Sequence, residues 1–422
     1  MTRTFALVDV NNFYVSCERL FRPDLRDTPV VVLSNNDGCI VARSQEVKDL
    51  GIKMGTPLFQ VMHQIKRHAI QVFSSNYTLY GDISARVMQT LEECCPRVEV
   101  YSIDEAFLDL SGMADVSEQG RLIRSTVMQN VGVPVCIGIA PTKTLAKLAS
   151  HAAKTYPATH GVVDLTDSDR QKRLMAITPV GDVWGIGRKL TKRLEEQGLK
   201  TALDLSKLPP KRARQTYSVV LERTVRELCG ENCLELDDVV SKRQQILCSR
   251  SFGEKLTHYE DVKQAICEFA ARAAAKLRGE DQLAGLVSVF LRTSPYESSR
   301  PQYANAATGA LAVPSSDTRK ILARVTSLYE AIWREGYRYA KAGVILADFC
   351  TPHDVQLDLF GAEKRPELGN SLMQAVDAVN RKSQGTLWFG GQRPQKDWYM
   401  RQANRSPAWT TRWDSLPRVN EL

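Results

Sequence analysis

Residues 5–14 read Phe-Ala-Leu-Val-Asp-Val-Asn-Asn-Phe-Tyr, and residues 101–107 read Tyr-Ser-Ile-Asp-Glu-Ala-Phe. Residues 5–10 of the first stretch are apolar except for Asp9, which predicts a buried strand with a carboxylate near its C-terminal end. The second stretch lies between two short apolar segments, so residues 102–105 are expected to form the tip of a hairpin. Together the two stretches predict a sheet that carries acidic side chains at one edge.

If these strands are neighbours, the carboxylates of Asp9, Asp104 and Glu105 converge. Like charges at such short range repel strongly unless cations neutralise them. Two Mg²⁺ ions would do so, because magnesium prefers carboxylate oxygens and completes its shell with water and phosphates. Two metals about 4 Å apart can activate a 3′-hydroxyl and stabilise a leaving pyrophosphate. The alternative is structural: Asp9 caps a turn, and Asp104 and Glu105 are solvated.

The sequence around these stretches predicts an α+β domain with helices packed on the sheet. Val133–Ala140 is expected to be a strand, and Ser117–Gln129 and Thr142–Lys154 are expected to be helices. Ala42–Leu50 is also expected to be helical and to stop at Gly51, a suitable residue just beyond a helix end.

The second half of the chain changes character. Asp182–Gly230 contains eleven Lys and Arg against six Asp and Glu and has no strand pattern, which predicts a small basic helical domain. Residues 245–350 alternate in the order βαββαβ, the split βαβ arrangement. From Thr351 onward we expect a tail with little core of its own. Its tryptophans suggest docking onto another surface: Trp388, Trp398, Trp409 and Trp413.

Composition sets broad limits. The net charge of +8 and the pI of about 8.9 fit a polyanionic partner without proving one. The ten cysteines include no CxxC pair, which argues against a zinc site and favours reduced thiols. There is neither a signal peptide pattern nor an apolar run of ~18 residues, so a cytoplasmic protein is expected.

The pairing of Asp9–Tyr14 with Tyr101–Phe107 resembles the signature of the Y-family translesion DNA polymerases. The resemblance continues through Val133–Lys154 and covers essentially the whole chain. It implies an α+β multidomain right hand: a palm with a mixed or antiparallel sheet, small fingers, a helical thumb with a helix-hairpin-helix, and a βαββαβ little finger. The implied divisions are palm 1–27 and 74–177, fingers 28–73, thumb 178–230, linker 231–244, little finger 245–350, and a partner-binding tail 351–422.

The same resemblance assigns the chemistry. It implies that Asp9, Asp104 and Glu105 hold two Mg²⁺ ions, with the Val10 carbonyl as a weaker ligand. The reaction would be error-prone, DNA-templated addition of dNTPs to a primer. Small fingers and the lack of a proofreading domain imply an open site that tolerates a damaged template base.

A nucleotide pocket follows from the resemblance. Tyr14 would be the steric gate under the deoxyribose, with Phe13 in the same substrate site. Lys48 and Lys154 align with positions that contact the triphosphate. Many family members carry a tyrosine and an arginine where this chain has Gln45 and Lys48, and a lysine is a point charge without arginine's bidentate fork. Either lysine could instead lie on a solvated helix face.

DNA contacts are expected in two places. Residues 183–198 resemble a helix-hairpin-helix, in which Gly185 and Gly187 let the backbone approach a phosphate and Lys189 adds charge. In the predicted little finger, Arg250, Ser251 and Arg292 are candidate phosphate contacts, although basic strand residues are often only solvated. The Gly185-Ile186-Gly187 cluster lacks the Lys-Ser/Thr of a Walker A motif, so we expect no P-loop ATP hydrolysis.

The tail carries two resemblances to partner-binding segments. Gln356-Leu357-Asp358-Leu359-Phe360 resembles the bacterial sliding-clamp-binding pentapeptide, in which apolar anchors on a flexible peptide fill a cleft. The block at 406–413 resembles the UmuC-like branch of the family, the catalytic subunits of bacterial DNA polymerase V. That branch implies a UmuD′-like accessory dimer, a RecA filament with ATP, and a role in SOS mutagenesis near the nucleoid.

Three alternatives remain open from the sequence. A nucleotide cyclase also uses two metals on a related palm, but needs neither a helix-hairpin-helix nor a clamp peptide. A non-catalytic DNA-binding scaffold is disfavoured by retention of all three carboxylates. A deoxycytidyl transferase of the same superfamily would differ only in which nucleotide it inserts.

Overall fold

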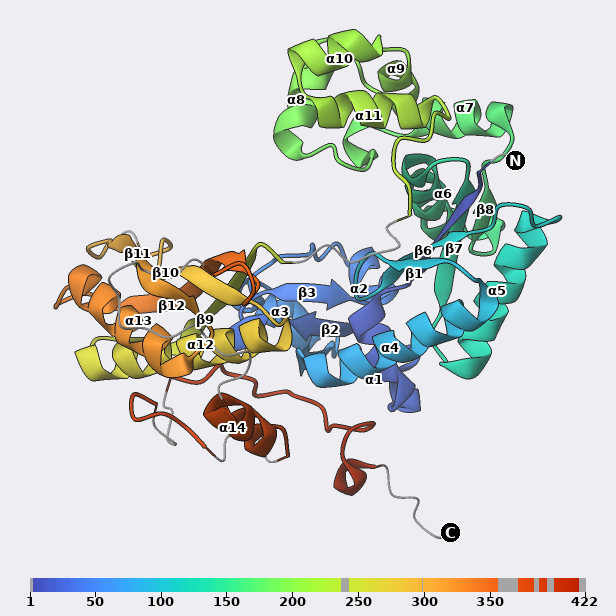
Figure 1. Cartoon of the computed structure of the whole chain (residues 1–422). Coiled ribbons are helices and arrows are strands. Elements are labelled where there is room, and N and C mark those ends of the chain that lie inside the picture. Colours follow the sequence, from blue (N-terminus) through green and yellow to red (C-terminus); the bar gives the residue numbers. More distant parts are fainter. Residues whose placement is uncertain are drawn as a thin grey trace, which may run out of the picture. The chain divides into compact units, whose positions relative to one another are not determined.

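The computed structural model describes residues 3–236, 243–297, 299–355, 371–382, 387–392 and 398–416. The chain forms two compact units, each with its own core (Figure 1). Unit 1 comprises Met1–Ser34, Gly38–Val240 and Ala403–Leu422, and unit 2 comprises Asn35–Asp37 and Ser241–Gln402.

The main sheet of unit 1 has five strands in the order β5-β6-β1-β7-β8. The central strand β1 pairs antiparallel with both β6 and β7, whereas β7 and β8 are parallel, so the sheet is mixed. The register places Asp9 of β1 opposite Glu105 of β6. The strand bounds are β1 Phe5–Val10, β5 Val98–Val100, β6 Glu105–Asp109, β7 Val135–Ala140 and β8 Val162–Asp164.

Alternate residues of β1 pack against helices on opposite faces of this sheet, as the two-residue strand period requires. The helices are α1 Phe13–Leu20, α4 Tyr77–Cys94, α5 Val116–Asn130 and α6 Lys143–Thr155. Ala6 and Val8 share a core with α1, α4 and α5, and Phe5 and Leu7 share a second core with α6. Gly138 of β7 allows α6 to approach the sheet, because a Cβ there would lie 2.1 Å from the backbone nitrogen of Ser150.

A small second sheet in unit 1 corrects one prediction. Ala42 and Arg43 lie in strand β3, paired with Val32 and Val31, and only the short helix α2 follows. The β-branched run that begins at Ile40 gains a neighbouring strand here, and this pairing overrides helix propensity. Gly51 does end the helical segment, at φ +78°. The elements are β2 Val30–Leu33, β3 Ile40–Arg43, α2 Gln45–Asp49, α3 Leu58–Arg67 and β4 Gln71–Ser74.

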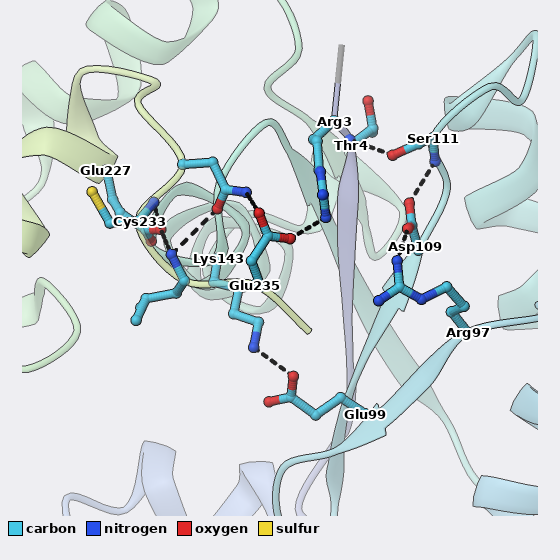
Figure 2. A network of polar contacts seen from close by, with 12 residues as sticks. Arg3, Thr4, Arg97, Glu99, Asp109, Ser111, Lys143, Glu227, Cys233 and Glu235 are labelled. Carbon is cyan, nitrogen blue, oxygen red and sulfur yellow. Dashed lines mark hydrogen bonds and ion pairs between the residues drawn. The ribbon is translucent and has the colours of Figure 1, made fainter. Parts of the chain in front are cut away.

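The basic segment of unit 1 is helical, as predicted. Its end is joined to α6 by the buried Glu227, which accepts hydrogen bonds from the backbone nitrogen of Thr144 at 2.9 Å and that of Cys233 at 3.1 Å. Figure 2 shows Glu227 with Cys233, and the ion pairs Lys143–Glu99 and Arg97–Asp109. The helices are α7 Ser168–Ile177, α8 Arg188–Glu196, α9 Ala202–Ser206, α10 Pro210–Thr216 and α11 Val219–Leu228.

Unit 2 has the predicted βαββαβ order. Its four strands are all antiparallel, in the order β11-β10-β12-β9, and both helices cover one face (Figure 1). The elements are β9 Gln245–Leu256, α12 Tyr259–Gly279, β10 Leu283–Thr293, β11 Ala304–Ser315, α13 Thr318–Ile332 and β12 Tyr339–Cys350.

Part of the tail packs on unit 2. Helix α14, Ser371–Lys382, was not predicted; it is held by Arg278, whose guanidinium donates to Asp377 at 2.6 and 2.7 Å. Trp398 is buried against Phe252 and Phe269, as expected for a docking tryptophan. Short 3-10 turns occur at Pro23–Leu25, Asn35–Asp37, Pro157–Thr159, Val180–Asp182 and Trp413–Ser415. Across the described parts of the chain, none of the helices is long and apolar enough to cross a membrane.

Candidate active site

The site is built at the end of β1. Asn12 adopts a left-handed conformation, φ 47°, which asparagine tolerates, and this turn leads directly into α1. Tyr14 therefore lies within one turn of the strand end that carries Asp9. The backbone nitrogen of Val10 donates to the carbonyl of Asp104 at 2.9 Å, so the hairpin tip is joined to the same strand end.

Two of the three predicted carboxylates are in direct contact. Asp9 is only 5% exposed and shares a hydrogen bond with Glu105. Burial raises the pKa of Asp9 to about 7; the bond to Glu105 adds to the rise and Lys154 offsets part of it. Burial also acts on Glu105, but the hydrogen bonds from Asp9 and Lys147 outweigh it and lower its pKa. The two like-charged groups are therefore in contact, and the pKa of Asp9 moves in the direction expected of a buried carboxyl beside another carboxylate.

Asp104 is held separately. Its Oδ1 accepts a hydrogen bond from Ser102 Oγ at 2.6 Å, which fixes the side chain within the hairpin tip. Among the described residues, no group of three or more His, Cys, Asp or Glu side chains gathers closely enough to enclose a metal. The donor set remains one of carboxylate oxygens, which suits a hard divalent cation that also takes ligands from water and substrate.

Helix α6 supplies the cations that face these carboxylates. Lys154 forms an ion pair with Asp9, and Lys147 donates to Glu105 at 2.6 Å. Lys147 also lies over the ring of Tyr101, 4.4 Å from its centroid. Lys147 was missed in the sequence; its position seven residues before Lys154, on the same helix face, was the available signal.

A second group of cations surrounds Lys48. Burial lowers the pKa of Lys48, and the positive charges of Arg43 and Lys154 lower it further. Arg43 was not a predicted site residue, and its side chain also donates to the carbonyl of Ile52. The side chain of Gln45 donates from Nε2 to Asp49 Oδ1 at 2.8 Å. Three neighbouring cations favour a polyanion at this place.

Tyr14 rests on an aromatic floor. Its ring stacks on Tyr80 with centroids 4.5 Å apart and an interplanar angle of 16°, and Tyr77 meets it edge-on at 6.1 Å. Tyr14 is partly buried. Phe13 is 4% exposed and lies in the core, with its ring centroid 5.7 Å from that of Tyr14.

The residues predicted to contact DNA fall in both units. In unit 1, Gly185 has φ +87° and Gly187 precedes α8; a 3-10 turn stands where a helix-hairpin-helix has its first helix. Lys189 is exposed.

In unit 2, Arg250 and Ser251 are exposed on β9. Lys341 of β12, which the sequence did not single out, lies opposite both Ser251 and Arg292 of β10. Burial and the charges of Arg292 and Arg250 lower the pKa of Lys341. We call Arg250, Arg292 and Lys341 the cation row.

The clamp-like peptide, Gln356 to Phe360, lies outside the described residues. The block at 406–413 is described and packs on unit 1, where Trp409 stacks on Phe21. This contact occurs within the chain itself.

The comparison with solved structures defines the fold. The chain is similar to a Y-family DNA polymerase chimera, Dbh-Dpo4(243-245)-Dbh, with a TM-score of 0.65 and 18% identity, covering 82% of this chain and 99% of that one. The architecture is therefore the Y-family right-hand fold, as predicted.

Sequence comparisons define the family. Residues 8–151 match the impB/mucB/samB family, 243–359 its C-terminal domain, and 370–419 a domain of unknown function (DUF4113). Protein UmuC of Salmonella typhimurium is 52% identical over 98% of this chain and 100% of its own length. Protein MucB of Escherichia coli is 49% identical over 98% and 99%, and DNA polymerase IV of Caulobacter vibrioides 25% identical over 90% and 92%. The chain belongs to the impB/mucB/samB family and is a UmuC-like, DNA-directed DNA polymerase of the translesion class.

Proposed function

We propose that the chain carries out error-prone translesion synthesis in the SOS response, adding nucleotides to a primer 3′-hydroxyl by two-metal nucleotidyl transfer. The observation that carries the proposal is the carboxyl pair of Asp9 and Glu105, joined through Val10 to the tip that holds Asp104. Lysine side chains and the aromatic ring of Tyr14 lie around this acidic edge. A substrate that carries both negative charge and a sugar requires such groups.

Asp9, Asp104, Glu105 and the Val10 carbonyl would hold Mg²⁺. The bound ions would supply charge neutralisation for the attacking and leaving oxygens. The chain's own residues prepare this site: Ser102 orients Asp104, and Lys147 holds Glu105 at 2.6 Å.

Lys48, Lys154 and Arg43 would bind the triphosphate. Lys154 is paired with Asp9 in this structure, and its flexible side chain is 40% exposed, so it can exchange the carboxylate for a phosphate oxygen. Tyr14 would lie beneath the sugar. A ring fixed on Tyr80 rejects a 2′-hydroxyl by steric overlap, which requires no hydrogen bond of its own.

The DNA backbone would be held by the cation row and by residues 185–189. In this proposal the chain is divided into five regions: palm 1–27 and 74–177, fingers 28–73, thumb 178–230, linker 231–244 and little finger 245–350. Backbone contacts carry no sequence information, which suits an enzyme that must act wherever damage occurs.

Partners complete the proposal. Residues 356–360 would bind the sliding clamp, and the tail would serve a UmuD′-like accessory dimer and a RecA filament with ATP. These partners would bring a cytoplasmic enzyme to the nucleoid. Their support is family resemblance.

The test is primer extension past an abasic site with Mg²⁺ and dNTPs, with and without clamp, accessory dimer and RecA filament. Asp104→Ala should lower the extension rate by about 10²–10³-fold while DNA binding persists. Asp169→Ala, which removes an exposed carboxylate of unit 1, is the matched control. Extension that survives Asp104→Ala, or none under any condition, would refute the proposal.

A further inference from the structure

The end of the tail lies along unit 1. We call residues 403–412 the tail segment. The backbone nitrogen of Ser74, at the end of β4, donates to the carbonyl of Asn404 at 3.0 Å, and the Asn404 nitrogen donates to Ser74 Oγ at 3.0 Å. Trp409 stacks on Phe21 with centroids 5.8 Å apart and an interplanar angle of 14°. The segment is thus docked by both backbone and aromatic contacts.

The tail segment supplies hydrogen-bond partners to a buried amide. Asn76 is 0% exposed and immediately precedes α4, the helix that carries Tyr77 and Tyr80. Its Nδ2 donates to the carbonyl of Ser406 at 3.1 Å and to Ser406 Oγ at 3.0 Å, and its Oδ1 accepts from Arg405 at 3.3 Å. A buried amide left without such partners is destabilised, so docking of the segment and placement of α4 are linked.

The tail segment also contacts a buried carboxyl on α1. Glu18 is 0% exposed, and its Oε1 accepts from Ser406 Oγ at 3.1 Å and from the Tyr80 hydroxyl at 2.7 Å. Its Oε2 has no hydrogen-bond partner among the described residues. Burial raises the pKa of Glu18, against the hydrogen bonds from Tyr80 and Ser406. Glu18 thus joins Ser406 of the tail to Tyr80 of α4.

Tyr80 is in turn the floor beneath Tyr14. The two rings are stacked at 4.5 Å, and Tyr80 is 0% exposed. Glu18 lies four residues after Tyr14, on the same side of α1. A continuous series of direct contacts therefore leads from Ser406 through Glu18 and Tyr80 to Tyr14.

We propose that the tail segment is a positioning element for Tyr14, acting through Glu18 and Tyr80, and so contributes to discrimination between deoxyribose and ribose. The inference rests on the proposed role of Tyr14 and assigns a task to the end of the domain of unknown function at 370–419. The reason is geometric. The ring of Tyr14 can exclude the 2′-hydroxyl of a ribose by steric overlap only if the ring cannot tilt. A deoxyribose lacks this hydroxyl and fits over a tilted ring equally well.

The decisive comparison is Trp409→Ala against Trp413→Ala. Both remove a tail tryptophan, but Trp413 is 87% exposed, whereas Trp409 contacts Phe21. Single-nucleotide insertion is measured with a dNTP and the rNTP of the same base, and the ratio of the two kcat/KM values is taken. Trp409→Ala should lower this ratio about five- to tenfold, mainly by lowering KM for the rNTP, because the loss of one aromatic pair has an effect of about this size. Trp413→Ala should leave it unchanged, since any effect on overall rate divides out.

A second pair of variants separates positioning from folding. Glu18→Gln keeps an acceptor in the place of Oε1, so folded protein should keep the wild-type ratio. Glu18→Leu removes the acceptor and should match Trp409→Ala. Thermal unfolding identifies any variant that fails to fold. If Glu18→Leu is such a variant, Ser406→Ala decides, because it removes a single hydroxyl, which donates to Glu18 and accepts from Asn76.

Tyr14→Ala in the same assay keeps the two proposals distinguishable. An unchanged ratio for Tyr14→Ala removes the gate role itself. If Tyr14→Ala collapses the ratio while folded Trp409→Ala and Ser406→Ala retain it, the gate stands and the positioning role of the tail segment is refuted.

Discussion

The two units use cations in opposite ways. In unit 1, Lys147 and Lys154 of α6 each face a carboxylate, Glu105 and Asp9. In unit 2, Lys341 of β12 faces Arg292 across one strand pair and lies near Arg250. Cations paired inside the fold orient acidic groups for chemistry, whereas like cations placed side by side favour the binding of a polyanion.

Burial sharpens the contrast. Lys147 is 14% and Glu105 18% exposed at the side chain, so their interaction is little screened by solvent. Arg292 and Lys341 lie on the sheet face away from α12 and α13, where polar residues alternate with buried ones, and Arg250 is exposed on the edge strand β9. The role of each cation is therefore indicated by the group that it faces, a carboxylate in unit 1 and another cation in unit 2.

The largest expected effect is on DNA binding. Replacing Arg250, Arg292 and Lys341 together by alanine should weaken affinity for primer-template DNA about 10–100-fold at moderate salt. The slope of log K against log salt should fall by about 2–3, since each neutralised phosphate contributes about 0.9. The rate of nucleotide addition at saturating DNA should be little changed.

Arg319→Ala is the control for that triple variant. Arg319 is an exposed cation of the same unit but is paired with Asp317 at 2.7 Å. Its removal should leave the slope unaltered. A triple variant with the wild-type salt slope would show that the cation row does not touch phosphate, and the contrast between the units would break down.

The next effect concerns the cations of unit 1. Lys154→Ala and Lys48→Ala should each raise KM for dNTP about tenfold, the effect of losing one charged hydrogen bond, with Kd for DNA unchanged. Lys172→Ala is the control, because Lys172 is an exposed lysine of unit 1 paired with Asp169. Equal KM values for Lys154→Ala and wild type would remove Lys154 from the nucleotide pocket.

The sequence predicted features whose determinants are local. The apolar strand ending near Asp9 and the hairpin at 102–105 depend on patterns within a few residues, and both are present, with Glu105 as the first residue of β6 and not in the tip. Helix α14 was missed; its Asp377 accepts hydrogen bonds from Arg278, about a hundred positions away, and such a contact is not visible in a local pattern. Propensity also failed at Ala42, where pairing with β2 decided the structure.

Candidate site residues divide in the same way. Asp9, Asp104 and Glu105 stand in short motifs, so their types and spacing sufficed to nominate them. Lys341 and Glu18 have ordinary local sequences, and their roles arise only from partners brought near by folding, such as Arg292 and Ser406. A single sequence contains no record of those contacts.

The smallest expected effect is on stability: removing a lysine charge should stabilise unit 2 but destabilise unit 1. Lys341→Met keeps the aliphatic stem but removes the charge opposite Arg292, so it should stabilise the β10–β12 pair by about 0.2–1 kcal/mol without DNA. Lys147→Met should instead destabilise unit 1, because it leaves Glu105 without its cation. Hydrogen exchange of the β10, β12 and β6 amides measures both changes locally. The gain from Lys341→Met should vanish at high salt, since screening already removes the repulsion. A gain that persists there would reflect strand propensity, and a loss of protection would show that Lys341 has a stabilising partner within unit 2.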